Sequence, residues 1–223
     1  MRLIKELQAL KSIPFTHATL KSLLKNYKNP NDKIKRMVKQ GEIIRVKQSL
    51  YVLGDIYYDV NISKELLANL IYGPSYISLE YALSYYGLIP ERVYEITSIT
   101  IKKKKRYDTA FGRFTYVKSP ACLYSKGITI KSNKDHTSYL MASVEKALCD
   151  KIIFTQKLGI ASVNAMIEYL QYDLRVDMDE LKGFDLDIIN QCISCGYKVK
   201  LLHLLYKTIE KPQERQDVAA DVK

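Results

Sequence analysis

Two short segments of the sequence carry residue types that could do chemistry. CISC at residues 192–195 has the CxxC spacing of zinc and redox sites. His203 is the only other soft ligand close to it in the sequence, so the set falls short of a tetrahedral zinc site. The segment also has a helical pattern. We therefore expect two small thiols in the core or at the surface, and no metal.

FDLD at residues 184–187 has the spaced aspartates of nucleotidyltransferases, but no Gly-Ser turn precedes it to hold a triphosphate, so ordinary loop acids are expected. Glu145 and Asp150 lie on one predicted helix, about 140° away from a shared face. Favourable charge in the first helical turn explains Glu145 better. His17 and His203 lack a serine or cysteine nucleophile pattern. We therefore predict no catalytic residues, no cofactor and no enzymatic activity.

The composition is that of a globular protein, with 47% hydrophobic and 26% charged residues among 223. The formal net charge of +11 is concentrated in two blocks. Residues 1–60 hold 12 Lys and Arg against 5 Asp and Glu, and residues 91–140 hold 11 against 4. Clustered cations gain free energy by releasing counterions from phosphates, which favours a polyanion as partner. A basic surface that merely keeps the chain soluble explains the charge equally well.

The sequence predicts a cytoplasmic protein without a membrane partner. No apolar run approaches the ~18 residues that a membrane span needs. Glu6 and Gln8 interrupt the N-terminal apolar residues, which makes this segment a poor signal peptide. The four cysteines are too few and too scattered for a disulfide scaffold, so a reducing compartment is expected.

The first 54 residues have the pattern of three short helices and a two-stranded ribbon. Apolar residues recur at helical spacing in residues 3–10 and 16–27, and a third helix begins at Pro30 and ends before Gly41. Residues 42–53 then read as two short strands. This order is typical of a winged helix-turn-helix, whose third helix enters the major groove of double-stranded DNA.

The third helix and the ribbon carry the cations that would contact DNA. Ile34, Met37 and Val38 are expected to face the other helices, which points Arg36 and Lys39 outward. The predicted DNA-binding residues are Lys33, Lys35, Arg36, Lys39, Arg45 and Lys47. A winged helix that binds a protein, with an ordinary charged helix face, is the alternative. The bias toward cations argues against it.

The segment after residue 61 has the pattern of a second, mixed α/β domain. Helical patterns at residues 62–73, 78–87 and 143–154 accompany β-like runs at 93–101 and 112–120. Between these runs, a cationic hairpin end is expected, formed by Lys102, Lys103, Lys104, Lys105 and Arg106. It is either a second polyanion contact or a solvated hairpin tip. The composition of the polar tail at residues 211–223 allows disorder.

Three successive segments of this domain resemble the signature blocks of a known family. They are GPSYISLEYALSYYGLIPE, YEITSITIKKKKRYDTAFGRFTYVKSP and MASVEKALCD. In this order they resemble AbiEi-type antitoxins, which belong to type IV toxin–antitoxin systems of abortive phage infection. The resemblance covers roughly residues 3–155, with weaker support to about residue 210. The chain departs from the family at the wing turn, residues 47–49, where the family usually has a glycine.

The resemblance implies an α+β chain with a winged helix-turn-helix at residues 1–54, an antitoxin domain at residues 61–210 and the tail at residues 211–223. It implies a transcriptional repressor that binds inverted repeats in its own promoter. It also implies an antitoxin that counteracts a nucleotidyltransferase-like toxin without a stable toxin complex. One alternative is a winged-helix repressor of other genes whose C-terminal domain senses a ligand or partner. A nuclease or nucleotidyltransferase with a DNA-targeting domain comes third.

Overall fold

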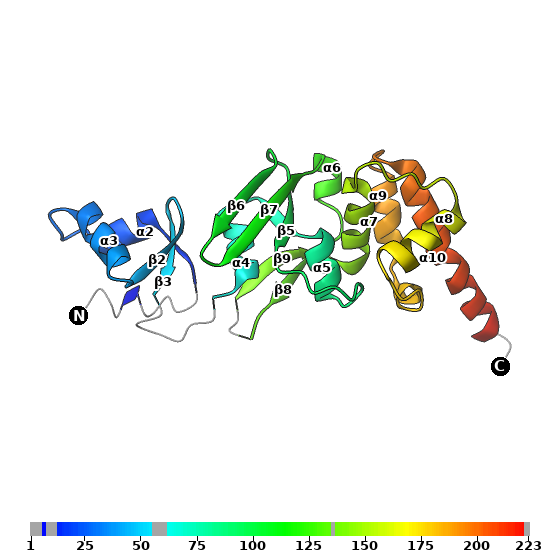
Figure 1. The fold of residues 1–223 in the computed structure, drawn as a ribbon, viewed down its shortest axis with the longest axis horizontal. Helices are drawn as coiled ribbons and strands as arrows, with labels where there is room; N and C mark the ends of the chain where they lie inside the picture. The colour runs from blue at the N-terminus through cyan, green and yellow to red at the C-terminus, as the bar shows by residue number, and fades with distance from the viewer. Residues whose placement is uncertain (1–5, 8–12, 55–61, 135–136, 221–223) are drawn as a thin grey trace.

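The computed structural model describes residues 6–7, 13–54, 62–134 and 137–220, with side chains as far as residue 210. A small N-terminal body, a six-stranded sheet and a group of helices follow one another along the long axis (Figure 1). Helices and mixed sheets make this an α+β fold, as the sequence predicts.

The N-terminal body packs two helices against a small antiparallel sheet of order β1–β3–β2. Its elements are β1 (Phe15–Thr16), α2 (His17–Leu23), α3 (Pro30–Lys39), β2 (Ile43–Lys47) and β3 (Leu50–Leu53). Thr16 caps α2 by accepting a hydrogen bond from the Thr19 amide. Pro30 begins α3, as predicted. The helix predicted at residues 3–10 lies outside the described residues except for Glu6 and Leu7, which are helical.

The ribbon formed by β2 and β3 contributes to two hydrophobic cores. Tyr51 and Leu53 belong to the core of the N-terminal body. Val46, Leu50 and Val52 belong to the large core of the rest of the chain. Successive strand residues point to opposite faces, so one short ribbon can fill both cores. The ribbon therefore connects the N-terminal body to the second part of the chain by apolar packing as well as by sequence.

The second part of the chain is built on a sheet of order β6–β7–β5–β4–β9–β8, in which the β4–β9 and β5–β7 pairs are parallel. Its strands are β4 (Ser75–Ile77), β5 (Ile96–Thr100), β6 (Lys105–Thr109), β7 (Gly112–Lys118), β8 (Ile128–Ser132) and β9 (Ser138–Ala142). On one face, α4 (Lys64–Ile71) accepts a hydrogen bond at the Ala68 carbonyl from Tyr116 of β7. On the other face, α5 (Leu79–Tyr85) and α7 (Val144–Phe154) contact β5 and β4 through Thr97 and Tyr76.

The cationic run does not end a hairpin, contrary to the prediction. β5 pairs with β7, and β6 lies outside β7 at the edge of the sheet. The hairpin that is present joins β6 to β7. Lys102, Lys103 and Lys104 instead lie in the crossover from β5 to the edge strand, and Lys105 and Arg106 begin that strand. β5 and β6 follow one another in the sequence but are not neighbours in the sheet, because a crossover connection places β7 between them.

The end of the chain is a helical group. Its elements are α8 (Val163–Glu168), the π-helix η1 (Tyr169–Asp173), the 3-10 helix η2 (Glu180–Gly183), α9 (Leu186–Ile193) and α10 (Val199–Ala220). The short helix α6 (Ala121–Tyr124) comes earlier, between β7 and β8. The aspartates of FDLD lie at the start of α9. Asp185 is its N-cap, and its carboxylate accepts a hydrogen bond from the Asp187 amide (2.9 Å). α10 continues to Ala220, so most of the segment predicted as a polar tail is helical.

The four cysteines lie on elements that pack together, which the sequence did not indicate. The prediction of two small thiols in CISC is correct for Cys192, which is buried and free, and wrong for Cys195. Cys195 forms a disulfide with Cys122, 73 residues away in the sequence. Cys149 is the second buried thiol. Its hydrogen bond with Cys192 lowers the pKa of Cys192. The same hydrogen bond, together with burial, raises the pKa of Cys149.

A buried ion pair lies where α7, α5 and β4 meet. The ammonium of Lys146 is 2.7 Å from the carboxylate of Asp150, one turn along α7, and both side chains are 0% exposed. The other carboxylate oxygen accepts hydrogen bonds from the hydroxyls of Tyr76 (2.9 Å) and Ser78 (2.8 Å). Burial raises the pKa of Asp150, and Lys146 opposes that rise. Ser78 stands at the N-cap of α5, yet its hydroxyl donates to Asp150 and does not cap the helix.

We expect the loss of either charge of this pair to destabilise the fold strongly. Lys146→Met leaves a buried carboxylate without its counter-ion, and Asp150→Asn leaves a buried ammonium in the same state. Each should lower the free energy of unfolding by about 3–5 kcal/mol. The double variant buries no charge and retains an acceptor for the Tyr76 hydroxyl, so it should be more stable than either single variant. Denaturant unfolding of all four proteins measures the coupling.

The exposed pair of Arg113 and Asp108 provides the matched control. Its atoms are also 2.7 Å apart, but the side chains are 51% and 61% exposed. Asp108→Asn should change stability far less than Asp150→Asn, because water screens the exposed pair. Equal effects of Asp108→Asn and Asp150→Asn would mean that burial does not set the strength of the internal pair.

Candidate nucleic-acid interface

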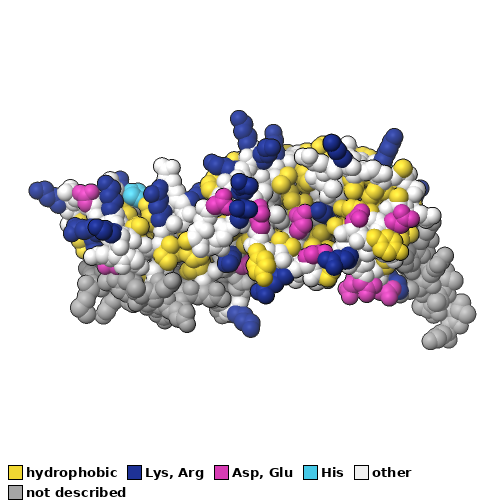
Figure 2. Space-filling view, viewed as in Figure 1, with side chains coloured by type: hydrophobic (Ala, Val, Ile, Leu, Met, Phe, Trp, Pro, Cys, Tyr) yellow, Lys and Arg dark blue, Asp and Glu magenta, His cyan; other side chains and the backbone are white. Residues whose placement is uncertain are grey.

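The outward face of α3 is basic. Lys35, Arg36 and Lys39 are exposed, while Ile34 and Met37 are buried under the helix. Figure 2 shows Lys and Arg side chains projecting from this end of the molecule. A helix that buries one face and presents cations on the other has the geometry needed to approach a phosphate backbone.

Two details of α3 differ from the predicted arrangement. Val38 was expected in the apolar face, but it is 36% exposed. Lys33 was expected to track phosphates, but its ammonium lies 3.6 Å from the carboxylate of Glu42 and its side chain is only 23% exposed. Lys35 lies 3.8 Å from Asp32 with both side chains well exposed, a pair too weak to hold it. Lys35, Arg36 and Lys39 are therefore the cations of α3 most accessible to a ligand.

The two cations of the ribbon have different surroundings. Arg45 is exposed on β2. Lys47, at the end of β2, reaches across to the second part of the chain, where its ammonium donates to the carbonyl of Ile71 (2.5 Å). The same ammonium lies 5.9 Å from the ring centre of Tyr107 on β6. Lys47 thus joins the ribbon to the sheet edge, a role that its position in the sequence did not reveal.

The cationic run meets the ribbon at this point. The ammonium of Lys105 lies over the rings of Tyr72 (5.7 Å) and Tyr107 (5.0 Å), and Lys102 lies over Tyr72 (5.4 Å). Lys47 shares Tyr107 with Lys105. We call Lys47, Tyr72, Lys102, Lys105 and Tyr107 the lysine–tyrosine cluster. It connects the two basic blocks of the sequence.

The remaining cations of the run point in several directions. Lys103 and Lys104 are exposed beside the cluster. Arg106 is one residue out of phase with Lys105 on β6, so it projects from the opposite face of the sheet, 3.9 Å from Asp108. Lys102 also donates to the carbonyl of Gly73 (2.5 Å). The cluster and its two exposed neighbours thus form one basic surface, and Arg106 lies apart from it.

Tyr72 and Tyr107 are the residues that sequence reasoning missed. Tyrosine has no charge, and 18 tyrosines in the chain gave no reason to single out two of them. One signal was available for Tyr107, because Lys105 and Tyr107 are two apart on a strand and so share a face. Tyr72 gave no such signal, since only the fold brings it beside β6, with ring centres 6.0 Å apart.

No protein-family model matches this chain, and no curated protein matches its sequence. In the described part of the chain, no helix is long and apolar enough to cross a membrane, and no group of three His, Cys, Asp or Glu side chains could hold a metal ion. Neither comparison assigns a function to the basic surface.

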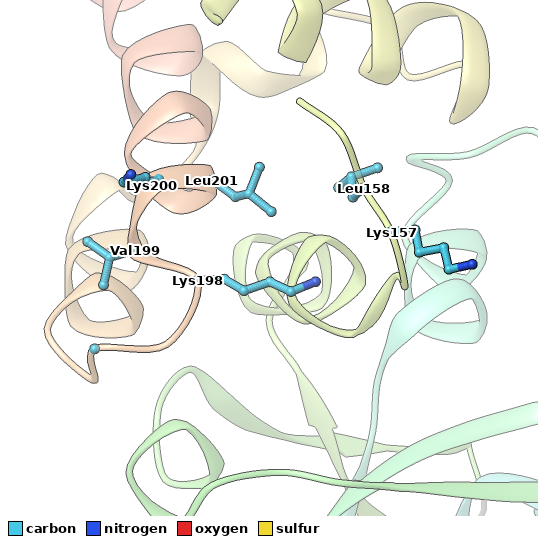
Figure 3. A pocket seen from close by; sticks show the side chains of 7 residues that line it. Lys157, Leu158, Lys198, Val199, Lys200 and Leu201 are labelled. Atoms are coloured by element: carbon cyan, nitrogen blue, oxygen red, sulfur yellow. The ribbon is translucent and has the colours of Figure 1, made fainter. Parts of the chain in front are cut away.

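A second basic feature, at the start of α10, does not form a site. A pocket of about 420 Å³ there is lined by Lys157, Lys198 and Lys200 together with apolar residues. Figure 3 shows that Lys157 and Lys200 extend away from one another. Lys198 donates to the carbonyls of Thr155 (2.8 Å) and Ile152 (3.4 Å) and thereby satisfies the end of α7. The three ammonium groups therefore do not point toward a common position where one anion could bind.

The ribbon turn has a left-handed residue where the sequence lacks a glycine. Ser49 has φ of 66°, and its carbonyl accepts a hydrogen bond from the His17 amide (3.0 Å). Residues other than glycine are disfavoured in this left-handed conformation. The turn therefore keeps the shape that glycine would favour, at a cost to stability.

We expect Ser49→Gly to stabilise the chain by up to about 1 kcal/mol, because glycine adopts this φ without steric strain. Gln48→Gly is the matched control: Gln48 has no positive φ, so glycine there should destabilise by about 0.5–1 kcal/mol. Thermal unfolding of the two variants measures both effects. A Ser49→Gly variant less stable than the native chain would contradict the strain at this turn.

Proposed function

We propose that this chain is a DNA-binding antitoxin that represses its own promoter. In this proposal residues 1–54 form a winged helix-turn-helix, α3 is its recognition helix and the ribbon is its wing. The partner is double-stranded DNA with inverted repeats. The antagonist is a nucleotidyltransferase-like toxin, which the chain counteracts in the cytoplasm without a stable complex and without enzymatic activity of its own.

The observation that carries the DNA-binding part is the lysine–tyrosine cluster. Two basic blocks separated by the nearly neutral residues 61–90 meet there, next to the ribbon. Like charges repel, and the tyrosine rings and backbone carbonyls around these lysines offset that repulsion. A surface that runs from α3 across the ribbon to β6 would instead contact more phosphates than the N-terminal body alone.

The antitoxin part rests on the resemblance of the segments after residue 73. Two of its three blocks contain the buried network: SYIS holds Tyr76 and Ser78, and SVEKALCD holds Lys146 and Asp150. Residues that bury a charge together can be exchanged only together. This constraint explains why the signature blocks include these positions. A nucleotidyltransferase-like reading frame beside the gene would support this part independently.

The second candidate is a repressor of other genes whose C-terminal part senses a ligand. A cleft of about 470 Å³ between α5, β5, α7 and the π-helix favours it. Ligand sites of small molecules are commonly concave and of this size. Growth assays with the toxin separate the two candidates, since only the antitoxin restores growth.

We expect Arg36→Ala/Lys39→Ala to weaken operator binding and to lower its salt dependence. Each lost phosphate contact removes up to ~0.9 from the slope of log K against log salt concentration. The control is Lys200→Ala/Lys207→Ala, which removes the same charge from exposed positions on α10. Titrations with labelled operator at several salt concentrations measure both quantities. Equal slopes for the two double variants would exclude α3 as the recognition helix.

The same full-length variants separate repression from toxin neutralisation. Arg36→Ala/Lys39→Ala should fail to repress a promoter fusion and still restore growth to cells that express the toxin. Lys103→Ser/Lys104→Ser changes the exposed cations beside the lysine–tyrosine cluster. It should weaken operator binding if these cations meet DNA, and leave it unchanged if they are merely solvated. If Arg36→Ala/Lys39→Ala folds and represses normally, the proposed DNA-binding surface is wrong.

A further inference from the structure

A disulfide and a pair of free thiols occur together where α6, α7 and α9 meet. The disulfide joins Cys122 on α6 to Cys195, which follows the end of α9. The free thiols are Cys149 on α7 and Cys192 on α9, and a hydrogen bond joins them. Figure 1 shows the three helices at the junction of the sheet and the helical group. The segment around the end of α9 thus contributes one sulfur to each pair.

Cys192 and Cys195 belong to one turn of the backbone. Cys192 lies in the last turn of α9, and the Cys195 amide donates a hydrogen bond to the Cys192 carbonyl (3.3 Å). Side chains three residues apart in such a turn are neighbours on its surface. The spacing is also that of the CxxC motif, in which two cysteines can form a disulfide with one another. A free thiol therefore lies one turn away from a disulfide sulfur.

The two ends of this arrangement differ in their access to water. Cys192 is 0% exposed, whereas Cys122 is exposed on α6. Burial keeps dissolved oxidants and electrophiles away from Cys192, but it does not separate Cys192 from a sulfur in its own turn. An attack by Cys192 on Cys195 would therefore have its nucleophile inside the fold and its leaving group at the surface.

The surroundings favour this direction of charge movement. The hydrogen bond from Cys149 lowers the pKa of Cys192 against the effect of burial, and the charges of Lys146 and Lys126 lower it further. The thiolate is the nucleophilic form of cysteine, so these groups activate Cys192. At the other end, water stabilises a thiolate on the exposed Cys122. Exchange would move negative charge out of the buried site.

Noncovalent contacts hold α6 in place without the disulfide. Leu123 is 0% exposed, and the ring centre of Tyr124 lies 5.2 Å from that of Tyr76 on β4. Just after α6, the Gly127 carbonyl accepts a hydrogen bond from the Ser143 amide (2.8 Å). Loss of the bond between Cys122 and Cys195 therefore does not require α6 to leave the fold.

We propose that Cys192 displaces Cys122 from its disulfide, and that this exchange makes Cys122 a reactive thiol at the surface. The Sγ of Cys192, as thiolate, attacks the Sγ of Cys195. A bond forms between Cys192 and Cys195, and the bond from Cys195 to Cys122 breaks.

The exchange balances without an oxidant or a reductant. The electron pair of the broken bond leaves with Cys122, which takes up a proton from water, and the proton of Cys192 goes to water. The thiol released on α6 is open to modification by small electrophiles. The inference does not depend on DNA binding or on toxin neutralisation.

Alkylation of the full chain with N-ethylmaleimide tests the exchange. The chain is purified and labelled without reductant, quenched with acid, digested, and its labels and disulfides are mapped by mass spectrometry. We expect molecules in which Cys122 is alkylated and Cys192 is joined to Cys195, because the reagent traps the released thiol. Cys192→Ala should abolish the alkylation of Cys122. Cys149→Ala keeps the nucleophile and should slow the alkylation about threefold, since the thiolate fraction of Cys192 falls.

Cys122→Ser gives a second test that does not depend on the folding of Cys192→Ala. Oxidised with glutathione disulfide, it should join Cys192 to Cys195 and leave Cys149 as the free thiol. A bond from Cys149 to Cys195 in this variant would overturn the proposal. So would a native chain whose Cys122 stays unlabelled, or one in which all four cysteines are alkylated. Equal alkylation of Cys122 in the native chain and in Cys192→Ala would exclude Cys192 as the nucleophile.

Discussion

The charge buried between α7 and β4 is the constraint on which the second part of the chain depends. A carboxylate at 0% exposure is tolerated only with partners on every side, and Asp150 has three: Lys146 on its own helix, Tyr76 on β4 and Ser78 at the start of α5. These bonds fix how α5 and α7 sit on one face of the sheet. Hydrophobic packing alone would hold the helices there without fixing their rotation, whereas three directional hydrogen bonds specify it.

Local signals predicted α3, the ribbon and the helix starts, because each depends on neighbours in the sequence. Proline at the start of α3 and alternation along β2 are properties of a few residues. The position of β6 outside β7 and the bond between Cys122 and Cys195 depend on segments that only the fold brings together. The burial of Lys146 escaped prediction for a related reason: charged residues are expected at the surface, and only the spacing of four to Asp150 hinted at a pair.

The candidate interface was predicted in part. Helical periodicity predicted the exposed cations of α3, because the positions of the apolar residues determine which side chains face outward. The role of Lys47 could not be predicted, because its partners are a carbonyl and a ring from distant segments. Through that contact the ribbon is attached to the second part of the chain. A ribbon held by Lys47 and by the packing of Val46 and Leu50 offers a partner an oriented surface, which lowers the ordering cost of binding.

The basic surface lies on the opposite face of the sheet from the cleft between α5, β5, α7 and the π-helix, which four carboxylates line. Tyr107 shares its face with Phe114 and Tyr116, beneath α4, whereas Thr97 in the cleft faces α5. Opposite charges on one face would compete for each other in water, so this separation leaves both available to ligands. The cleft also shares α5 and α7 with the buried network, since Glu80 lies on α5 and Lys151 on α7, next to Asp150. A ligand bound in this cleft would therefore stabilise the contact that Asp150 orients, and mass action would transmit that stabilisation to the folded state as a whole.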